Sequence, residues 1–324
     1  MIDAADIEQA AFRLRDVALR TPLIENPVLN EIAGGRVFLK AECFQVTGSF
    51  KIRGAYNLLS QLTTEQAARG VVAFSSGNHA QGVAAAARSL GIRARIVMPA
   101  DAPTTKLENT RRLGGEVITY DRATGDREAI AREIAAQHAA AVVPSFDHPQ
   151  IMAGQGTVGL EIAEQCEAMR VRPDQVMICC GGGGLTAGSA VALESRMPGA
   201  DVFTVEPAAF DDTARSLELG RRVAVAPGAQ SICDALLIER PGELTFAVNR
   251  RLVSRGLTVS ETEVRNAMRF AFREMKLVLE PSGAVALAAV LAGKVTTSGR
   301  TTVAVLSGGN VDFERYLAIQ GSTA

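Results

Sequence analysis

Short apolar runs rich in β-branched residues alternate with helical patterns along much of this chain. The runs of the first series are 71–74, 95–98, 116–119 and 141–143, and the helical patterns between them are 78–90, about 106–113 and about 126–138. Strands that alternate with helices in this way predict parallel strands joined by crossover helices. The sequence therefore predicts an α/β fold, in which parallel-rich, twisted sheets are flanked by helices.

A second series of strand-like runs follows in the later part of the chain. Its runs are 175–179, 201–205 and 301–306, with amphipathic helical patterns near 261–274 and 283–292. The 324 residues are too many for one ordinary core and suit two domains. We expect a large domain formed by residues 1–69 and 147–324, and a small α/β domain formed by residues 70–146.

Charge and composition argue against several classes of protein. Lys and Arg total 34 against 35 for Asp and Glu, without a basic run, so nothing favours nucleic acid or an anionic membrane as a partner. No stretch reaches the roughly 18 apolar residues of a membrane helix, and no secretory signal is visible. The five cysteines lack metal-type spacing, which favours a reducing compartment. We expect a soluble, cytoplasmic protein.

Three of the predicted strands end in glycine-bearing turns, and one of these turns is unusual. It contains four consecutive glycines, namely Gly181, Gly182, Gly183 and Gly184. Such a run is costly in backbone entropy, but it lets backbone N–H groups approach an anion at the start of a helix. The pattern matches neither a dinucleotide fingerprint nor a P-loop. A flexible turn is the alternative, and we favour a cradle for the phosphate of a cofactor other than ATP or NAD.

Lys51 is the second feature that indicates chemistry. It lies between Phe50 and Ile52, just after a Thr-Gly-Ser turn that could cap a helix. Apolar surroundings disfavour the charged form of a lysine, which lowers its pKa and makes the amine a nucleophile. A solvated surface lysine is the ordinary alternative. Together with a phosphate cradle, a lysine able to form a Schiff base indicates pyridoxal phosphate.

Five motifs follow one another along the chain. They are Ser49-Phe50-Lys51-Ile52-Arg53-Gly54-Ala55, Ser75-Ser76-Gly77-Asn78-His79, Gly154-Gln155-Gly156-Thr157, the tetraglycine run and Ser307-Gly308-Gly309-Asn310. In this order they resemble the serine/threonine dehydratases and the closely related serine racemases, over essentially the whole length. The resemblance implies the two-domain, tryptophan-synthase-β-like fold of pyridoxal-phosphate enzymes (fold type II). It also implies a homodimer formed through the large domain.

The resemblance assigns each matched residue a role around the cofactor. Lys51 would carry pyridoxal phosphate as a Schiff base, and Phe50 would pack near its ring. Asn78 would hydrogen-bond to its phenolic oxygen, and the four glycines would hold its phosphate. Ser307 would face the pyridine nitrogen, where a neutral hydroxyl suits elimination because it does not enforce a protonated ring. A simple turn residue is the alternative for Ser307.

The implied reaction is the loss of water from a small β-hydroxy amino acid, with L-threonine or L-serine giving a 2-oxo acid and ammonia. Lys51 would take the Cα proton. The substrate carboxylate would be held by the segment Ser75-Ser76-Gly77-Asn78-His79, whose N–H groups open a helix. Ser76 would act as acid or base on the opposite face, as in serine racemases, or serve only as a cap or carboxylate ligand.

Other activities stay open. A 3-hydroxyaspartate dehydratase and a serine racemase share the same motifs, and the former would need an extra cation, for which Arg127 and Arg122 are candidates. A catalytically inactive pyridoxal-phosphate carrier is a different class, against which the retained Lys51, Asn78 and Ser307 argue. A nucleotide-dependent enzyme would need a phosphate-binding motif that the chain lacks.

The resemblance further implies a bound Mg²⁺ or Ca²⁺. Glu206, the carbonyl of Phe210 and Asp212 match the segment that binds such ions in the racemases and in some dehydratases. Hard oxygen ligands of this kind suit both ions. An ordinary solvated acidic loop is the alternative.

The chain departs from the family pattern at two places. Ser231-Ile232-Cys233-Asp234-Ala235-Leu236 stands where relatives commonly have Ala-Asp-Gly, which leaves substrate preference open. The chain also ends at Ala324, soon after the Ser-Gly-Gly-Asn motif. We therefore expect no C-terminal regulatory domain of the biosynthetic threonine enzymes, and no feedback by isoleucine.

Overall fold

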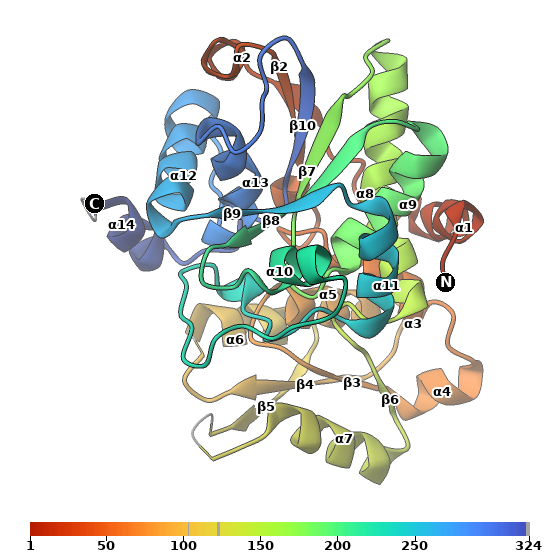
Figure 1. Cartoon of the computed structure of the whole chain (residues 1–324). Helices are drawn as coiled ribbons and strands as arrows, with labels where there is room; N and C mark the ends of the chain where they lie inside the picture. The colour runs from red at the N-terminus through yellow and green to blue at the C-terminus, as the bar shows by residue number, and fades with distance from the viewer. Residues whose placement is uncertain (103, 122–123, 322–324) are drawn as a thin grey trace.

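Two β-sheets organise the chain in the computed structural model, which describes residues 1–102, 104–121 and 124–321 (Figure 1). The larger sheet has six strands in the order β1-β2-β10-β7-β8-β9, and the smaller has four in the order β5-β4-β3-β6. Every neighbouring pair is parallel except β1 and β2. The prediction of an α/β fold with parallel-rich sheets and flanking helices is confirmed.

The six-stranded sheet combines strands from both ends of the chain. Its members are β1 (Leu23–Glu25), β2 (Arg36–Ala41), β7 (Gln175–Cys179), β8 (Asp201–Pro207), β9 (Arg255–Val259) and β10 (Thr301–Leu306). The three predicted strand runs of this region are confirmed as β7, β8 and β10. Sequence analysis did not identify β2, because the charged Lys40 interrupts its apolar run and yet is fully buried.

Helices flank this sheet in Figure 1, and the buried helix α13 packs against β7, β8, β9 and β10. The elements are α1 (Ala4–Leu14), α2 (Pro27–Ala33), η1 (Glu42–Phe44), α3 (Lys51–Leu59), α8 (Pro149–Ala168), α9 (Gly184–Arg196), α10 (Asp212–Leu219), η2 (Asp234–Leu236), α11 (Glu243–Leu252), α12 (Glu261–Met275), α13 (Pro281–Leu291) and α14 (Phe313–Gly321). Glycines let α8 and α9 approach closely, since a Cβ on Gly159 would lie 2.6 Å from the Cα of Ser189.

The four-stranded sheet is built from one continuous stretch of chain. Its strands are β3 (Val71–Phe74), β4 (Ala94–Pro99), β5 (Glu116–Tyr120) and β6 (Ala141–Val142), with the helices α4 (Thr64–Arg69), α5 (Asn78–Ser89), α6 (Thr104–Arg112) and α7 (Arg127–His138). Helices α3, α5 and α6 lie between the two sheets in Figure 1. The predicted strand–helix alternation of this region is confirmed, while the domain boundaries at 70–146 stay a prediction.

The ends of three strands lead directly into the predicted site. Ser75 follows β3, the glycine loop follows β7 after Cys180, and Ser307 follows β10. This is the edge at which open α/β sheets bind ligands. Within the described ranges, none of the helices combines the length and the apolar character needed to cross a membrane.

Candidate active site

Lys51 is the first residue of α3 and lies beside the turn that contains Ser307. The backbone N–H of Phe50 donates to the carbonyl of Ser307 at 3.3 Å, and Ser49 forms a β-bridge with Gly308. The Lys51 Nζ donates to the carbonyl of Ser145 at 3.1 Å and lies 5.1 Å from the centre of the Phe50 ring. Burial lowers the pKa of this amine to about 8. About a tenth of this amine is therefore neutral at pH 7, far more than for an exposed lysine.

The glycine loop turns sharply from β7 into α9. Gly183 has a φ of +91°, a conformation that favours glycine, and it precedes α9 without a side-chain cap. A Cβ on Gly182 would lie 2.2 Å from Cγ of Phe146, so no larger residue fits. The carbonyl of Gly182 accepts from Thr245 Oγ1 at 2.6 Å, which anchors the loop to α11. The first N–H groups of α9 are thus available to an anion.

Asn78 begins α5, and its side chain bonds to those of Glu280 and Asn310. Neither contact was predicted from the sequence. Its Nδ2 donates to Oε1 of Glu280 at 2.6 Å, and its Oδ1 accepts from Nδ2 of Asn310 at 2.7 Å. Burial, reinforced by the charge of Asp234, raises the pKa of Glu280 to about 8. The only sequence signal for Glu280 is an acid between the apolar residues Leu279 and Pro281.

Ser307 is buried at the end of β10 and shares a hydrogen bond with the thiol of Cys179. Cys179 ends the predicted strand run 175–179, and its sulfur also borders the site. Burial raises the pKa of this thiol to about 11, so it stays protonated near neutral pH. The Cys179 S–H and the Ser307 hydroxyl are therefore both neutral donors at the strand ends.

The segment from Ser75 to His79 joins β3 to α5. Ser75 Oγ accepts from the N–H of Gly77 at 3.2 Å, and a Cβ on Gly77 would meet no atom within 4 Å, so space lies beside this turn. His79 Nε2 lies 3.0 Å from the carbonyl of Val143, which requires the proton on Nε2. Burial lowers the pKa of His79 to about 3. His79 is thus neutral and offers no positive charge to a substrate carboxylate.

A water-sized cavity of about 10 Å³ adjoins this segment. Ser75 and Ser76 line it together with Tyr120 and Arg127, among others. The guanidinium carbon of Arg127 lies 5.9 Å from the centre of the Phe74 ring. Arg127 is therefore close to the predicted carboxylate-binding segment, while Arg122 lies outside the described residues.

The predicted metal ligands lie beneath the glycine loop, where Cys180 Sγ is 3.4 Å from Oγ1 of Thr213. The Glu206 carboxylate accepts from the N–H groups of Thr213 and Ala214 at 2.9 and 2.8 Å. Asp212 is buried, and its Oδ2 has no hydrogen-bond partner. Burial raises the pKa of both carboxyls, to about 7 for Asp212. Phe210 is buried at the same turn.

No cluster of three or more His, Cys, Asp or Glu side chains that could hold a metal occurs in the described ranges. The predicted set differs from such a cluster, because it contains two carboxylates and one backbone carbonyl. A buried carboxylate oxygen without a partner is costly unless a proton or a cation satisfies it. The donor chemistry of Glu206 and Asp212 therefore fits a hard divalent cation.

Comparisons with known proteins agree with this geometry. A family model described as pyridoxal-phosphate dependent enzyme matches residues 14–308. The chain is 43% identical to the L-threo-3-hydroxyaspartate ammonia-lyase of Pseudomonas sp, over 97% of both chains. It is 40% identical to the serine racemase of Schizosaccharomyces pombe, over 96% of this chain and 95% of that protein. The crystal structure of the T.th. threonine deaminase superposes with a TM-score of 0.91 at 42% identity, over 96% of this chain and 99% of that one.

Proposed function

This chain belongs to the family of pyridoxal-phosphate dependent enzymes, and on that premise we propose that it eliminates water from a small β-hydroxy amino acid. The products would be a 2-oxo acid and ammonia. The observation that carries the proposal is the buried, pKa-lowered amine of Lys51 beside Ser307, at the same sheet edge as the glycine loop. The relatives support the same reaction class, because two of them are named for the removal of ammonia from a hydroxy amino acid.

The residues of the site fit this cofactor. The Lys51 amine would hold it covalently, and the glycine loop would take its phosphate, because no side chain of the loop caps the first N–H groups of α9. Phe50 would pack near the ring, Asn78 would donate to its phenolic oxygen and Ser307 would face its nitrogen. Bound pyridoxal phosphate supplies an electron sink for the charge that develops at Cα when its proton is removed.

Three groups of the protein would move the protons and bind the substrate. The Lys51 amine would take the Cα proton of the bound substrate, because its lowered pKa leaves more of it neutral than an exposed lysine at the same pH. The N–H groups at the start of α5, after Gly77, hold the substrate carboxylate, because a helix N-terminus attracts anions. Ser76 supplies an acid or base on the face opposite Lys51, which would also permit racemisation.

A 3-hydroxyaspartate is the second candidate substrate, beside L-threonine and L-serine. Its additional carboxylate requires a cation near the substrate, and Arg127 lines the cavity next to Ser75 and Ser76. A guanidinium binds a carboxylate through paired hydrogen bonds. Arg127 therefore supports activity on the dicarboxylic substrate. Threonine has a methyl group and serine a hydrogen in place of the second carboxylate, and neither can bind a guanidinium.

We also propose that Glu206, the Phe210 carbonyl and Asp212 hold Mg²⁺ or Ca²⁺. The support is the buried Asp212 Oδ2 without a partner, next to a second buried carboxylate. Such a cation would fix the start of α10 beneath the glycine loop. A homodimer formed through the large domain stays a prediction of the family resemblance.

The test combines the absorption spectrum with 2-oxo acid release from L-threonine, L-serine, D-serine and the 3-hydroxyaspartates. The wild type should show a visible cofactor band and form 2-oxo acid, and the rate ranking identifies the substrate. Lys51→Ala should lose the band and at least 1000-fold in rate, as expected for removal of a nucleophile and base (on the order of 4 kcal/mol). Lys294→Ala, which alters only an ion pair with Glu263, is the matched control.

Two outcomes would contradict the proposal. A wild type without a visible band after addition of pyridoxal phosphate would remove the role of Lys51. A bound cofactor without turnover of any substrate in the panel would favour the inactive cofactor carrier instead.

A further inference from the structure

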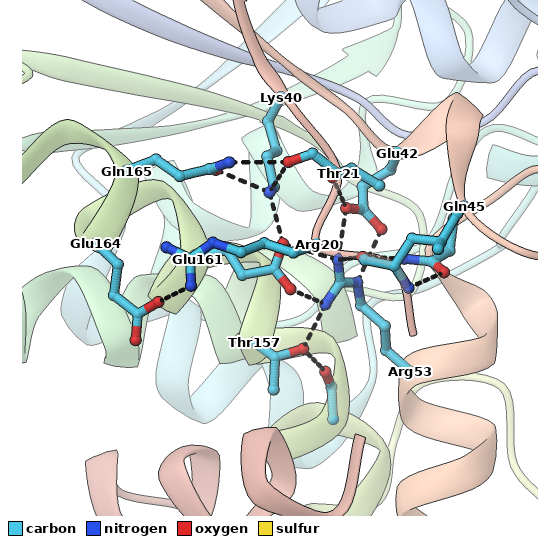
Figure 2. A network of polar contacts seen from close by, with 12 residues as sticks. Arg20, Thr21, Lys40, Glu42, Gln45, Arg53, Thr157, Glu161, Glu164 and Gln165 are labelled. Carbon is cyan, nitrogen blue, oxygen red and sulfur yellow. Dashed lines mark hydrogen bonds and ion pairs between the residues drawn. The ribbon is translucent and has the colours of Figure 1, made fainter. Parts of the chain in front are cut away.

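A buried cluster of four charged side chains includes one residue of α3, the helix that begins with Lys51 (Figure 2). Its members are Lys40, Glu42, Arg53 and Glu161. The side chains of Lys40 and Glu42 have no exposed surface, that of Arg53 has 1%, and that of Glu161 has 15%. Two cations face two carboxylates, so the cluster is formally neutral. Arg53 belongs to the motif around Lys51, but no role for it could be predicted from the sequence.

Two carboxylates accept hydrogen bonds from Arg53 on different edges of its guanidinium. Its Nε and Nη2 donate to the two oxygens of Glu42, both at 2.8 Å. Its Nη1 and Nη2 donate to the two oxygens of Glu161 at 2.6 and 3.0 Å. Thr157 Oγ1 and the carbonyl of Leu19 accept further bonds, both at 3.1 Å. Paired bonds of this kind fix the plane and direction of a guanidinium, which a single charge contact would not do.

Lys40 provides an internal comparison, because it belongs to the same cluster but lies on β2. Its Nζ donates to Glu161 Oε2 at 2.6 Å, to Gln165 Oε1 at 2.9 Å and to the carbonyl of Thr21 at 2.8 Å. Burial would raise the pKa of Glu42, but Arg53, Lys40 and the hydrogen bond from Thr21 together outweigh it, so the pKa is lowered. Arg53 and Thr21 thus hold Glu42, Arg53 and Lys40 hold Glu161, and Arg53 connects both carboxylates to α3.

Arg53 points away from the catalytic amine on the same helix. Two residues correspond to about 200° around an α-helix, so Arg53 and Lys51 leave α3 on nearly opposite sides. The start of α3 at Phe50 has no side-chain cap of its own. A rotation of α3 by about 10° would move an amine about 8 Å from the axis by more than 1 Å. A displacement of that size is enough to reduce catalysis about 100-fold.

The backbone of α3 near Lys51 packs closely against glycines of two neighbouring helices. A Cβ on Gly82 would lie 3.0 Å from the carbonyl carbon of Lys51, and a Cβ on Gly154 would lie 2.5 Å from the carbonyl oxygen of Arg53. Helices α5 and α8 thus limit translation of α3. The ion pairs of Arg53 with η1 and α8 add the constraint that limits its rotation.

We propose that Arg53 is a positioning residue for Lys51, which sets the rotation of α3 and so the place of the Lys51 amine. The proposal rests on the proposed function, in which that amine holds the cofactor. It gives Arg53 an effect on catalysis that acts only through the position of Lys51, whereas Lys40 lies on β2 and has no such link to α3.

The test compares two pairs of variants by cofactor affinity, by the pH midpoint of the visible band and by the melting temperature. Arg53→Lys keeps the charge and loses both paired contacts. It should weaken cofactor binding at least 10-fold, shift the band midpoint and lower kcat 10- to 100-fold with little change in KM. Lys40→Met, which disturbs the same cluster from β2, should lower the melting temperature but leave affinity and band close to wild type.

A milder pair keeps the test decisive if either charged variant fails to fold. Thr157→Val removes one acceptor of Arg53, whereas Thr21→Val removes the 2.5 Å bond to Glu42 without touching Arg53. Only Thr157→Val should weaken cofactor affinity, by about 2- to 5-fold. The same variant alone should also shift the pH midpoint of the band. Equal effects within both pairs, or no spectroscopic change in any variant, would show a purely structural cluster and overturn the inference. Absence of the band from the wild type would instead contradict the proposed function.

Discussion

The amide of Asn78 donates a 2.6 Å hydrogen bond to Glu280, a buried carboxyl at the start of α13. Asn310 donates to the opposite end of the same amide at 2.7 Å. These two contacts decide which end of Asn78 is nitrogen and which is oxygen. One N–H of Asn78 is used by Glu280, and we infer that the second is the one available to the cofactor oxygen. The contact joins the first turn of α5 to the six-stranded sheet region.

The raised pKa of Glu280 predicts a specific dependence of stability on pH. Burial moves this pKa from 4.5 to about 8, so the folded protein keeps a proton that the unfolded chain releases. The stabilising contribution is therefore complete below about pH 4.5 and is lost as pH rises through about 8. Glu280→Gln imitates the protonated form. Between pH 5 and 8.5 the free energy of unfolding should decrease in the wild type and much less in this variant. The two decreases should differ by on the order of 3 kcal/mol.

Denaturant unfolding of the apoprotein at several pH values measures this difference. Glu261, an acid that does not contact Asn78, provides the comparison. Its variant Glu261→Gln should keep the wild-type dependence of unfolding free energy on pH. Parallel stability curves for wild type and Glu280→Gln would mean that the buried carboxyl is ionised in the folded protein.

Gly182→Ala should disturb the phosphate cradle. The added Cβ would lie 2.2 Å from Cγ of Phe146, so either the ring or the loop must move, at a cost of about 1–3 kcal/mol. We expect cofactor affinity to fall about 10-fold or more, as measured by fluorescence titration of the apoenzyme. Gly321→Ala, whose Cβ meets no atom within 4 Å, should bind like the wild type. Unchanged affinity in Gly182→Ala would place the phosphate elsewhere.

Replacement of Arg127 by Met should separate the candidate substrates. A lost hydrogen bond to a charged group amounts to about 1.5–3 kcal/mol, so kcat/KM for L-threo-3-hydroxyaspartate should fall about 10- to 100-fold. The value for L-threonine should stay within about 2-fold, since threonine has no second carboxylate. Arg132→Met is the control, because Arg132 lies five residues further along α7 and, among the contacts described, pairs only with Glu128 at 3.6 Å. Equal losses on both substrates would contradict a specificity role for Arg127.

Addition of a cation should stabilise the protein through Asp212. A ligand that binds only the folded state raises its melting temperature, so Mg²⁺ or Ca²⁺ in excess should add about 3 °C or more. Asp212→Asn should abolish the response. Asp211→Asn, which instead removes a partly exposed ion pair with Arg215, should retain it. A wild type that responds to neither cation nor to chelator would argue against the metal.

The strand–helix alternation of the four-stranded sheet was predictable because each element there depends on neighbours in sequence. Val71–Phe74 is a short buried strand, and Asn78–Ser89 is an alanine-rich helix that follows a glycine turn. The long helix α8 was not identified. Its glycines lower helix propensity, and only the structure shows that Gly154 and Gly159 allow close packing against α3 and α9.

The sequence by itself determined the order of the motifs, the candidate lysine and the glycine loop, since a tight turn and its helix start are encoded by adjacent residues. Tertiary structure alone decided that Glu280 meets Asn78, 202 positions away, and that Arg53 meets Glu161, 108 positions away. The pKa values of Lys51 and Glu280 likewise follow from burial, which depends on how the two sheets and their helices pack. Contacts and dielectric surroundings between distant segments leave no periodic pattern in the chain, so only folding brings them together.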